Sequence, residues 1–260
     1  MENYMEFVDT HAHLYTEEFE NDRNDIILRA KNEGVKRVIL PAIDSKSHEY
    51  MIKMAEENEG FAFPLMGLHP TSVDNNYKSE LKIAENFLSQ GSFFHGIGEI
   101  GIDLYWDKTY YKEQLDAFKI QVEWAKEMNW PIVIHTRDSF DEVYKALYPL
   151  MTDDLTGIFH CFGGTEEQAK LIIEMGFKLG IGGVLTFKNS KLSDVLQKID
   201  LNHIVLETDS PYLAPVPYRG KRNESSYLKL IATKLSEVYN VSVNELAKIT
   251  TENAIRVFNL

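Results

Sequence analysis

Short apolar runs rich in β-branched residues alternate with longer amphipathic stretches along this chain, and that alternation restricts the possible folds more than any other feature. Strands that alternate with helices are joined by crossovers, which makes their sheet parallel. Eight runs are predicted to be strands: Glu6–Asp9, Arg37–Pro41, Ala62–Leu68, Phe94–Glu99, Pro131–His135, Gly157–His160, Phe177–Ile181 and His203–Glu207. Eight such units predict an α/β fold, a (β/α)₈ TIM barrel of parallel strands inside a ring of helices, with residues 1–260 as a single domain.

Periodicity and capping predict the helices. Between the fourth and fifth strands, apolar residues recur at helical spacing: Leu115, Phe118, Val122, Ala125 and Met128. Two more helical patterns follow the eighth strand, and the last opens with a capping box formed by Ser242 and Glu245. We expect this extra C-terminal helix to close the outer ring of helices.

Several features predict a cytoplasmic location without membrane association. The first eight residues contain no basic segment followed by an apolar one, and no run approaches the roughly 18 apolar residues of a membrane span. Cys161 is the only cysteine, which excludes an internal disulfide and agrees with a reducing compartment. No obligate protein partner is inferred, and a monomer is the default.

The net charge of −13 argues against a protein that grips long duplex nucleic acid through a broad basic face. It does not exclude a nuclease. Some of the carboxylates would be metal ligands, and two bound divalent ions would add four positive charges where a phosphate approaches.

Polar side chains of the metal-binding or catalytic type follow or end six of the predicted strands. They are His11, His13, His69, Glu99, His135, His160 and Asp209. Strand ends of this kind converge on one face of a (β/α)₈ barrel, where active sites of the fold are built. The intervals from His11 through Glu99, His135 and His160 to Asp209 correspond to about 24 to 36 residues per unit, close to the length of a βαβ unit.

Four histidines and two carboxylates are too many ligands for one tetrahedral ion. Two divalent ions about 3.5–4 Å apart and bridged by a carboxylate would use all six, namely His11, His13, Glu99, His135, His160 and Asp209. Such donors suit zinc, manganese, iron or nickel better than calcium, and Mg²⁺, Mn²⁺ and Zn²⁺ are the candidates we carry forward.

The positions of these residues suggest a division of roles. The imidazoles of His11 and His13 lie on the same side of an extended segment and can hold one ion together. Glu99 is the natural bridge, and His135 and His160 would hold the second ion. Asp209 would complete the first site and accept a proton from the attacking water.

Seven motifs make the sequence resemble the TatD family of metal-dependent deoxyribonucleases, within the amidohydrolase-like superfamily, over nearly the whole chain. In family order they are DTHAHL (Asp9–Leu14), GLHP (Gly67–Pro70), GEIGID (Gly98–Asp103), HTRDS (His135–Ser139), HCFGG (His160–Gly164), ETDSPYLAP (Glu207–Pro215) and YRGKRNE (Tyr218–Glu224). Two departures are small: the family usually has Ser where Gly163 stands and Pro where Ser225 stands.

The resemblance implies hydrolysis of DNA phosphodiesters, with the six residues above as metal ligands and Asp209 as the base. Glu99 and His69 join Asp209 as the predicted catalytic residues. His69, Arg137 and the segment Arg219–Arg222, with Lys221 inside it, would face the substrate.

Loops on the ligand-bearing face supply groups for nucleic acid. Cations that can meet a phosphate are Arg137, Lys188, Arg219, Lys221 and Arg222. Tyr105, Tyr212 and Tyr218 can stack on unpaired bases. We therefore expect DNA with short or single-stranded ends as the partner, cleaved by an exonuclease that acts on single-stranded or frayed DNA.

Structural explanations stand beside several of these assignments. His48, His95 and His203 lie away from the predicted active face, and Cys161 should face the helices as a small buried residue. His69 could be part of a turn, and the basic run from Arg219 could be a solvated loop. Asp103 and Asp138 would orient ligands or cap helices, and Glu207 would orient a ligand or bond inside the barrel.

Two rival functions remain open. One is a related metallohydrolase that acts on an ester or amide, such as an aminoacyl-tRNA ester, a lactone or a cyclic amide. The other is a barrel that binds nucleic acid without turnover, against which the complete ligand set and Asp209 speak.

Overall fold

The part of the chain that the structure describes contains eight strands, which are parallel and form two sheets. The computed structural model describes residues 5–91 and 93–260, so residues 1–4 of the predicted domain lie outside it. One sheet has the order β1 (Phe7–Asp9), β2 (Val35–Pro41) and β3 (Ala62–Leu65). The other has the order β4 (Ile97–Asp103), β5 (Ile132–Arg137), β6 (Gly157–Phe159), β7 (Lys178–Ile181) and β8 (Ile204–Leu206).

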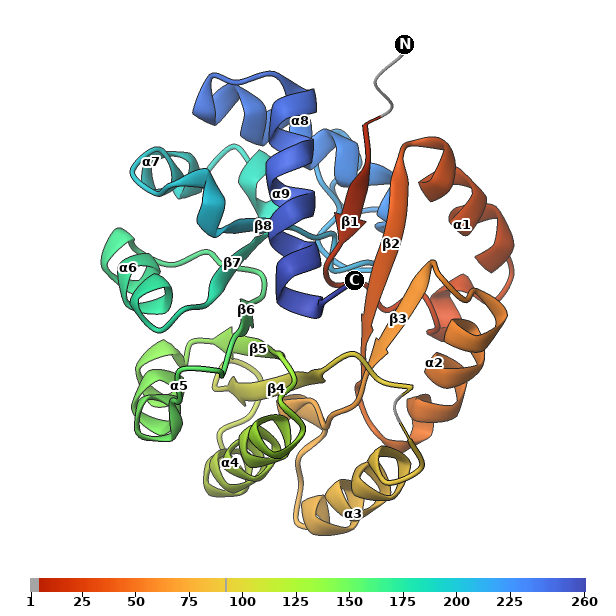
Figure 1. Cartoon of the computed structure of the whole chain (residues 1–260), viewed down its shortest axis with the longest axis vertical. Coiled ribbons are helices and arrows are strands. Elements are labelled where there is room, and N and C mark those ends of the chain that lie inside the picture. Colours follow the sequence, from red (N-terminus) through yellow and green to blue (C-terminus); the bar gives the residue numbers. More distant parts are fainter. Residues whose placement is uncertain (1–4, 92) are drawn as a thin grey trace.

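Single parallel bridges connect the two sheets at both seams, one between Met66 and Ile97 and one between Ala12 and Ser210. The result is an α/β, TIM-barrel-like arrangement with its strands in chain order (Figure 1). The predicted strand number, direction and order are confirmed, whereas the ladder is interrupted at both seams rather than continuous.

The fourth strand differs most from its prediction of Phe94–Glu99, because it begins at Ile97 and runs to Asp103. The aromatic Phe94 belongs to the buried core but precedes the strand. One additional residue lies between Ile97 and Ile100 relative to β5, which is a bulge that redirects the chain at Glu99. A side chain at Gly98 would bring its Cβ within 2.9 Å of Val133, so the bulge can pass this close to β5 only with glycine. The other seven strands overlap their predictions, with ends shifted by three residues or fewer.

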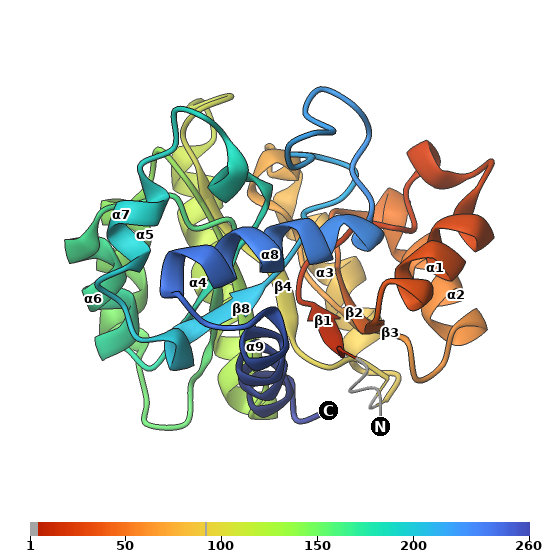
Figure 2. The ribbon, with the colours of Figure 1, turned by 90° about the horizontal axis from the view of Figure 1, so that it is seen from above.

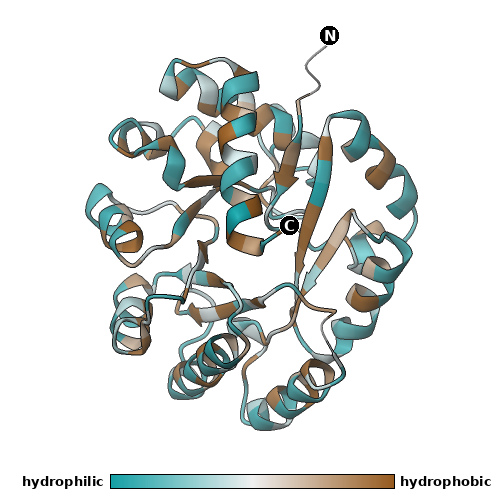
Figure 3. Ribbon diagram, viewed as in Figure 1, coloured by the Kyte–Doolittle hydropathy of each residue, from teal (hydrophilic) through white to brown (hydrophobic). Residues whose placement is uncertain are grey.

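Helices surround the strands (Figure 1), with apolar residues toward the strands and polar residues outward (Figure 3). They are α1 (Arg23–Asn32), α2 (Ser45–Glu57), α3 (Tyr77–Leu88), α4 (Tyr111–Met128), α5 (Phe140–Leu147), α6 (Glu166–Glu174), α7 (Leu192–Leu196), α8 (Leu228–Tyr239) and α9 (Val243–Phe258). Short 3₁₀ helices are η1 (Glu17–Phe19), η2 (Pro70–Ser72), η3 (Tyr148–Leu150), η4 (Gly183–Thr186), η5 (Leu201–His203) and η6 (Ser225–Tyr227). The predicted helix between the fourth and fifth strands is confirmed as α4, whose Phe118, Val122 and Ala125 are fully buried. None of the helices in the described ranges combines the length and the hydropathy that a bilayer crossing requires.

The last helix, α9, begins where it was predicted but lies elsewhere. The Ser242 side chain accepts a hydrogen bond from the Glu245 amide at 3.1 Å, which caps the helix. Ala254, Val257 and Phe258 pack against six buried apolar side chains, one from each of six strands: Val8, Ile39, Leu65, Val133, Ile158 and Val205. The helix thus lies under the strands, on the side opposite to the long loop after β8 (Figure 2). The expectation that it closes the outer ring is wrong. The apolar side chains of the strands on this side would otherwise be exposed to water, and α9 buries them.

Candidate metal centre

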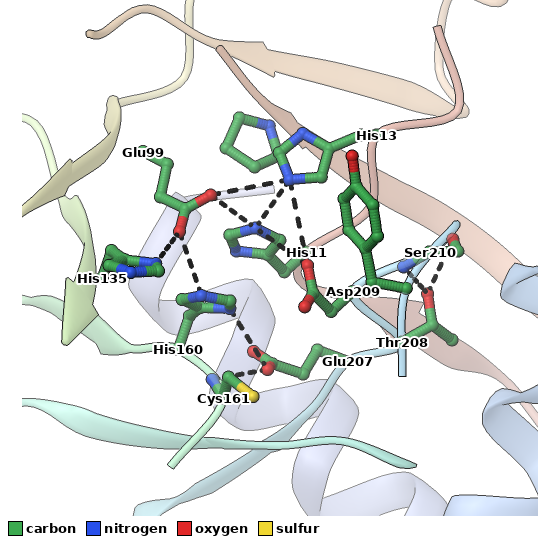
Figure 4. A network of polar contacts seen from close by, with 12 residues as sticks. His11, His13, Glu99, His135, His160, Cys161, Glu207, Thr208, Asp209 and Ser210 are labelled. Atoms are coloured by element: carbon green, nitrogen blue, oxygen red, sulfur yellow. Dashed lines mark hydrogen bonds and ion pairs between the residues drawn. The ribbon is translucent and has the colours of Figure 1, made fainter. Parts of the chain in front are cut away.

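Glu99 is the point on which the predicted ligands converge (Figure 4). Its side chain is only 2% exposed, and each of its two oxygens faces a different group of histidines. Oε2 lies 3.0 Å from Nε2 of His11 and 3.5 Å from Nε2 of His13, which both follow β1. Asp209, which follows β8, places Oδ1 at 3.8 and 3.9 Å from the same two nitrogens. These four side chains form the first half-site.

The second half-site surrounds the other oxygen of Glu99. Oε1 lies 2.7 Å from Nδ1 of His135 in β5 and 3.0 Å from Nε2 of His160, directly after β6. Nε2 of His69 approaches the same oxygen at 3.2 Å. Ligand atoms held at about 2.0–2.2 Å from one ion lie roughly 3–4 Å apart, and His11, His13 and Glu99 of the first half-site have this spacing. Around the other oxygen, His69, Glu99 and His135 have ligand atoms within 4.8 Å of one another.

The hydrogen bonds of the His13 ring test whether a cation fits between the donor atoms. The Tyr15 hydroxyl donates to the carbonyl of Pro41 at 2.6 Å, so it accepts from Nδ1–H of His13 at 3.0 Å. The lone pair on Nε2 of His13 then points at the carboxylates of Glu99 and Asp209. Lone pairs repel unless a proton or a cation lies between them, and the nitrogen and oxygen donors match a divalent metal ion.

His69 differs from the other histidines in what it offers the site. The backbone amide of Thr71 donates to its Nδ1 at 3.1 Å, which leaves the proton on Nε2. Burial lowers the pKa of His69, although the charge of Glu99 opposes this. In this structure His69 therefore presents an N–H to the centre of the site, although its ligand atom also lies within 4.8 Å of those of Glu99 and His135.

The buried carboxylates and histidines of the site shift one another's pKa values. Burial alone would raise the pKa of Glu99, but His69, His160 and His11 hold it well below its usual range. Burial would lower the pKa of His160, but Glu99 and Glu207 hold it well above its usual range. Burial also raises the pKa of Asp209 to about 6. Metal ligands must lose such protons when an ion binds, so protons and divalent ions compete for this site.

Asp103 and Asp138 were predicted to orient ligands or cap helices, and their positions differ. Oδ2 of Asp103 lies 2.9 Å from Nε2 of His135, and Oδ1 accepts the amides of Tyr105 and Trp106. Asp103 thus orients His135 and also caps a turn. Asp138 is exposed, and its carboxylate has no hydrogen bond among the described residues. Asp138 has a left-handed φ of 53° and makes no hydrogen bond to a ligand histidine or to a helix N-terminus among the described residues, so neither predicted role fits it.

Asp9 is a buried residue that the sequence reasoning missed. Its oxygens accept bonds from the Thr208 amide (2.9 Å) and hydroxyl (2.7 Å) and from the Ser225 hydroxyl (2.6 Å). It therefore ties β1 to the loop after β8 and to η6. Burial raises its pKa to about 7. The period-2 alternation that pairs His11 with His13 also includes Asp9, which is the signal that could have identified it.

A cleft of about 930 Å³ opens above Glu99. Its walls include Trp106 from the loop after β4 and Arg137 from the end of β5, and Phe187, Tyr212, Arg219 and Lys221 from the loops after β7 and β8. The Arg137 guanidinium lies 4.0 Å over the ring of Tyr105 and 5.2 Å over that of Trp106, and Arg219 lies 4.4 Å over Phe187. Trp106 is 69% exposed, and sequence reasoning also missed it.

Three other residues that were predicted to contact the substrate, namely Arg222, Tyr218 and Lys188, do not line the cleft. Arg222 makes a bidentate pair with Asp22 at 2.8 and 2.6 Å and covers the ring of Phe19, so it anchors its loop to the start of α1 instead of facing the cleft. The ring of Tyr218 stacks on Tyr227 at 4.2 Å. Lys188 is exposed and does not line the cleft in the described part of the chain.

Cys161 corrects another expectation, because it lines the cleft instead of facing the helices. Strand β6 ends at Phe159, and Cys161 has a left-handed φ of 49°, so strand alternation does not extend to it. Burial raises the pKa of its thiol to about 12, which makes it a poor nucleophile. His48, His95 and His203 do not line the cleft, as expected.

Comparisons of this chain with known proteins point to the same family of proteins. A family model described as TatD related DNase matches residues 8–259. The chain is 38% identical to a Bacillus subtilis (strain 168) protein named "uncharacterized metal-dependent hydrolase YabD", with 97% of this chain and 98% of that protein covered. It is 30% identical to the similarly named YcfH of Escherichia coli (strain K12), with 98% and 97% covered. The crystal structure of YJJV, a TatD homolog from Escherichia coli K12, superimposes with a TM-score of 0.93 at 27% identity, covering 99% of each chain.

Proposed function

The chain belongs to the TatD-related DNase family of metal-dependent hydrolases, and from this premise we propose that it is a deoxyribonuclease that hydrolyses phosphodiester bonds at unpaired ends of DNA. The observation that carries the proposal is the combination of two donor groups bridged by Glu99 with a cleft walled by guanidinium groups and aromatic rings.

Two divalent ions fit the donor groups. His11, His13 and Asp209 would hold one ion and His135 and His160 the other, with Glu99 shared between them. When bound, such ions polarise a phosphoryl oxygen and make water a stronger nucleophile at neutral pH.

The protein's own groups supply the remaining steps. The Asp209 carboxylate, with its pKa raised to about 6, accepts the proton of the attacking water. Nε2–H of His69 donates a hydrogen bond to a phosphoryl oxygen and stabilises the charge that develops there. Arg137, Arg219 and Lys221 neutralise flanking phosphates from the cleft walls.

The shape and charge of the surroundings favour unpaired DNA. Trp106 and Tyr212 are exposed rings at the cleft on which bases can stack. A neighbouring groove shares Trp106 with the cleft and is strongly acidic, with Asp44, Asp74, Glu80, Asp103 and Asp107 in its lining. Phosphates of a long duplex would be repelled there, whereas a short single strand can end inside the cleft.

The proposal is tested with short single-stranded DNA labelled at the 3′ or the 5′ end, incubated with Mg²⁺, Mn²⁺ or Zn²⁺. We expect stepwise release of nucleotides by the wild type, none with EDTA, and a loss of at least about 100-fold in rate for Asp209→Asn. Asp138→Asn is the matched control, since this exposed carboxylate has no hydrogen bond or ion pair among the described residues. If DNA survives with every metal while an activated ester or lactone is cleaved, the substrate is an ester or amide and the proposal fails.

A further inference from the structure

Buried polar atoms without hydrogen-bond partners gather beneath the candidate metal centre. Among the described residues five such atoms occur, and three of them are His11 Nδ1, His160 Nδ1 and Glu207 Oε2. Their side chains are at most 5% exposed. One nitrogen or oxygen from each of the three residues lies within 4.8 Å of the other two. A buried N–H or carboxylate oxygen left unpaired is unfavourable, so this cluster calls for an explanation.

The geometry of the two imidazoles directs both Nδ1 atoms to the same side. The rings of His11 and His160 stack with centroids 3.8 Å apart and planes 17° apart. Nε2 of each ring faces Glu99 at 3.0 Å. Since Nδ1 and Nε2 lie on different edges of an imidazole, both Nδ1 atoms are turned away from Glu99.

Glu207 lies on that inner side, so that His160 stands between two carboxylates (Figure 4). Oε1 of Glu207 accepts the Cys161 amide at 2.6 Å and lies 3.4 Å from His160 Nδ1. Oε2 has no partner. The fold leaves space for this oxygen, because a Cβ on Gly180 of β7 would lie only 2.1 Å from it.

We propose that Glu207 is a positioning residue for both half-sites. It accepts the Nδ1 proton of His160 through Oε1 and that of His11 through Oε2, by way of one buried water. An imidazole that offers Nε2 to a metal ion carries its proton on Nδ1, and an acceptor there fixes the tautomer and the ring orientation. A single water can bridge two buried polar atoms with two hydrogen bonds, and His11, His160 and Glu207 each offer one nitrogen or oxygen within 4.8 Å of those of the other two.

One carboxylate would thereby couple the two ions. His11 belongs to the first half-site and His160 to the second, so loss of Glu207 affects ligands of both. The inference rests on the metal centre of the proposed function but does not depend on DNA as the substrate. The competing explanation is that Glu207 only supports the turn at Cys161.

Glu207→Gln separates these explanations. Glutamine keeps the oxygen that accepts the Cys161 amide and faces His160 Nδ1, but replaces the oxygen assigned to His11 with an amide nitrogen that cannot accept a proton. The readout is isothermal titration of metal-free protein with Zn²⁺ and with Mn²⁺. We expect the binding step of the half-site with His11 to weaken by about 10- to 100-fold, with the melting temperature of the metal-free protein unchanged. Glu127→Gln, at an exposed position of α4, is the matched control.

Unchanged affinity at both steps in Glu207→Gln overturns the proposal. If the variant does not fold, a high-resolution crystal structure of the metal-loaded wild type decides instead. We expect a water within hydrogen-bond distance of His11 Nδ1 and Glu207 Oε2, and the absence of any bridge between these atoms overturns the proposal. A wild type that binds two ions but spares DNA contradicts the proposed substrate and leaves this inference intact.

Discussion

At the scale of single residues, the position of Glu99 is tightly constrained by the strand that carries it and by the histidines around it. Its carboxylate is buried, ionised and shared by two groups of histidines, and it reaches this place only because β4 bulges beside Gly98. A buried charge of this kind needs compensation, which protons on the histidines or bound cations provide.

Removal of metal should therefore lower stability. A ligand that binds only the folded state stabilises it by about 2.7 kcal/mol at 100 times its dissociation constant. We expect EDTA to lower the melting temperature of the wild type and added Mn²⁺ to restore it. Glu99→Gln should show no such response, because the shared charge is gone. A full Mn²⁺ response in that variant would contradict the role of Glu99 as the bridge.

Trp106 and Tyr212 should determine how firmly unpaired DNA is held. Stacking of a base on an aromatic side chain contributes about 1–3 kcal/mol. In an Asp209→Asn background, which prevents turnover, Trp106→Ala together with Tyr212→Ala should weaken binding of a short single strand by at least tenfold in fluorescence anisotropy. Tyr148→Ala, an exposed ring outside the cleft, is the control. Equal affinities for the two variants would rule out stacking.

At the scale of elements, the loop between β8 and α8 is held to α1 by ion pairs. Arg29 in α1 donates to both oxygens of Glu224 at 2.8 and 2.6 Å, and Arg222 pairs with Asp22. This anchoring explains why Arg219 and Lys221 reach the cleft while Arg222, in the same basic run, does not.

The Arg29 pair should contribute stability that depends on pH. Burial would raise the pKa of Glu224, but hydrogen bonds from Arg29 and Ser226 hold it below its usual value. A depressed pKa in the folded state means that the stabilisation is present above about pH 4.5 and is lost as the pH falls through the lower, folded-state pKa. Glu224→Gln should reduce the free energy of unfolding by about 1–2 kcal/mol at pH 7, discounted because Arg29 is half-exposed. Urea denaturation at pH 7 and pH 3 should show the difference shrinking, and a constant difference would count against this pair.

At the scale of the whole molecule, a net charge of −13 surrounds a cleft with three cations in its walls. DNA binding should then depend on divalent ions, because they add positive charge to a cleft in which Glu99, Asp103 and Asp209 offset the three cations. We expect no shift of a labelled duplex in EDTA even at low salt, and binding of a single strand by Asp209→Asn once Mn²⁺ is added. Tight duplex binding in EDTA would show that the charge argument is wrong.

The strands and the convergence of the candidate ligands could be predicted from local patterns in the sequence. The alternation of apolar runs with amphipathic stretches determined eight parallel strands in chain order, since period and length distinguish strands from helices. Because parallel strand ends meet on one face, the spacing of His11, Glu99, His135, His160 and Asp209 along the chain was enough to predict that they converge.

Other features depended on contacts between distant segments. The apolar stripe of α9 marks a helix but does not say that it covers the floor of the strands. A basic residue such as Arg222 turns from the cleft because Asp22, 200 residues away, pairs with it. The protons on His13 and His69 are placed by Tyr15 and Thr71, through geometry that no spacing rule contains. Sequence alone determined which elements form and which ends meet, because those follow from local periodicity. Tertiary structure decided which side chains remain free to act, because a hydrogen bond or ion pair is satisfied by whatever the fold brings within about 3 Å of it.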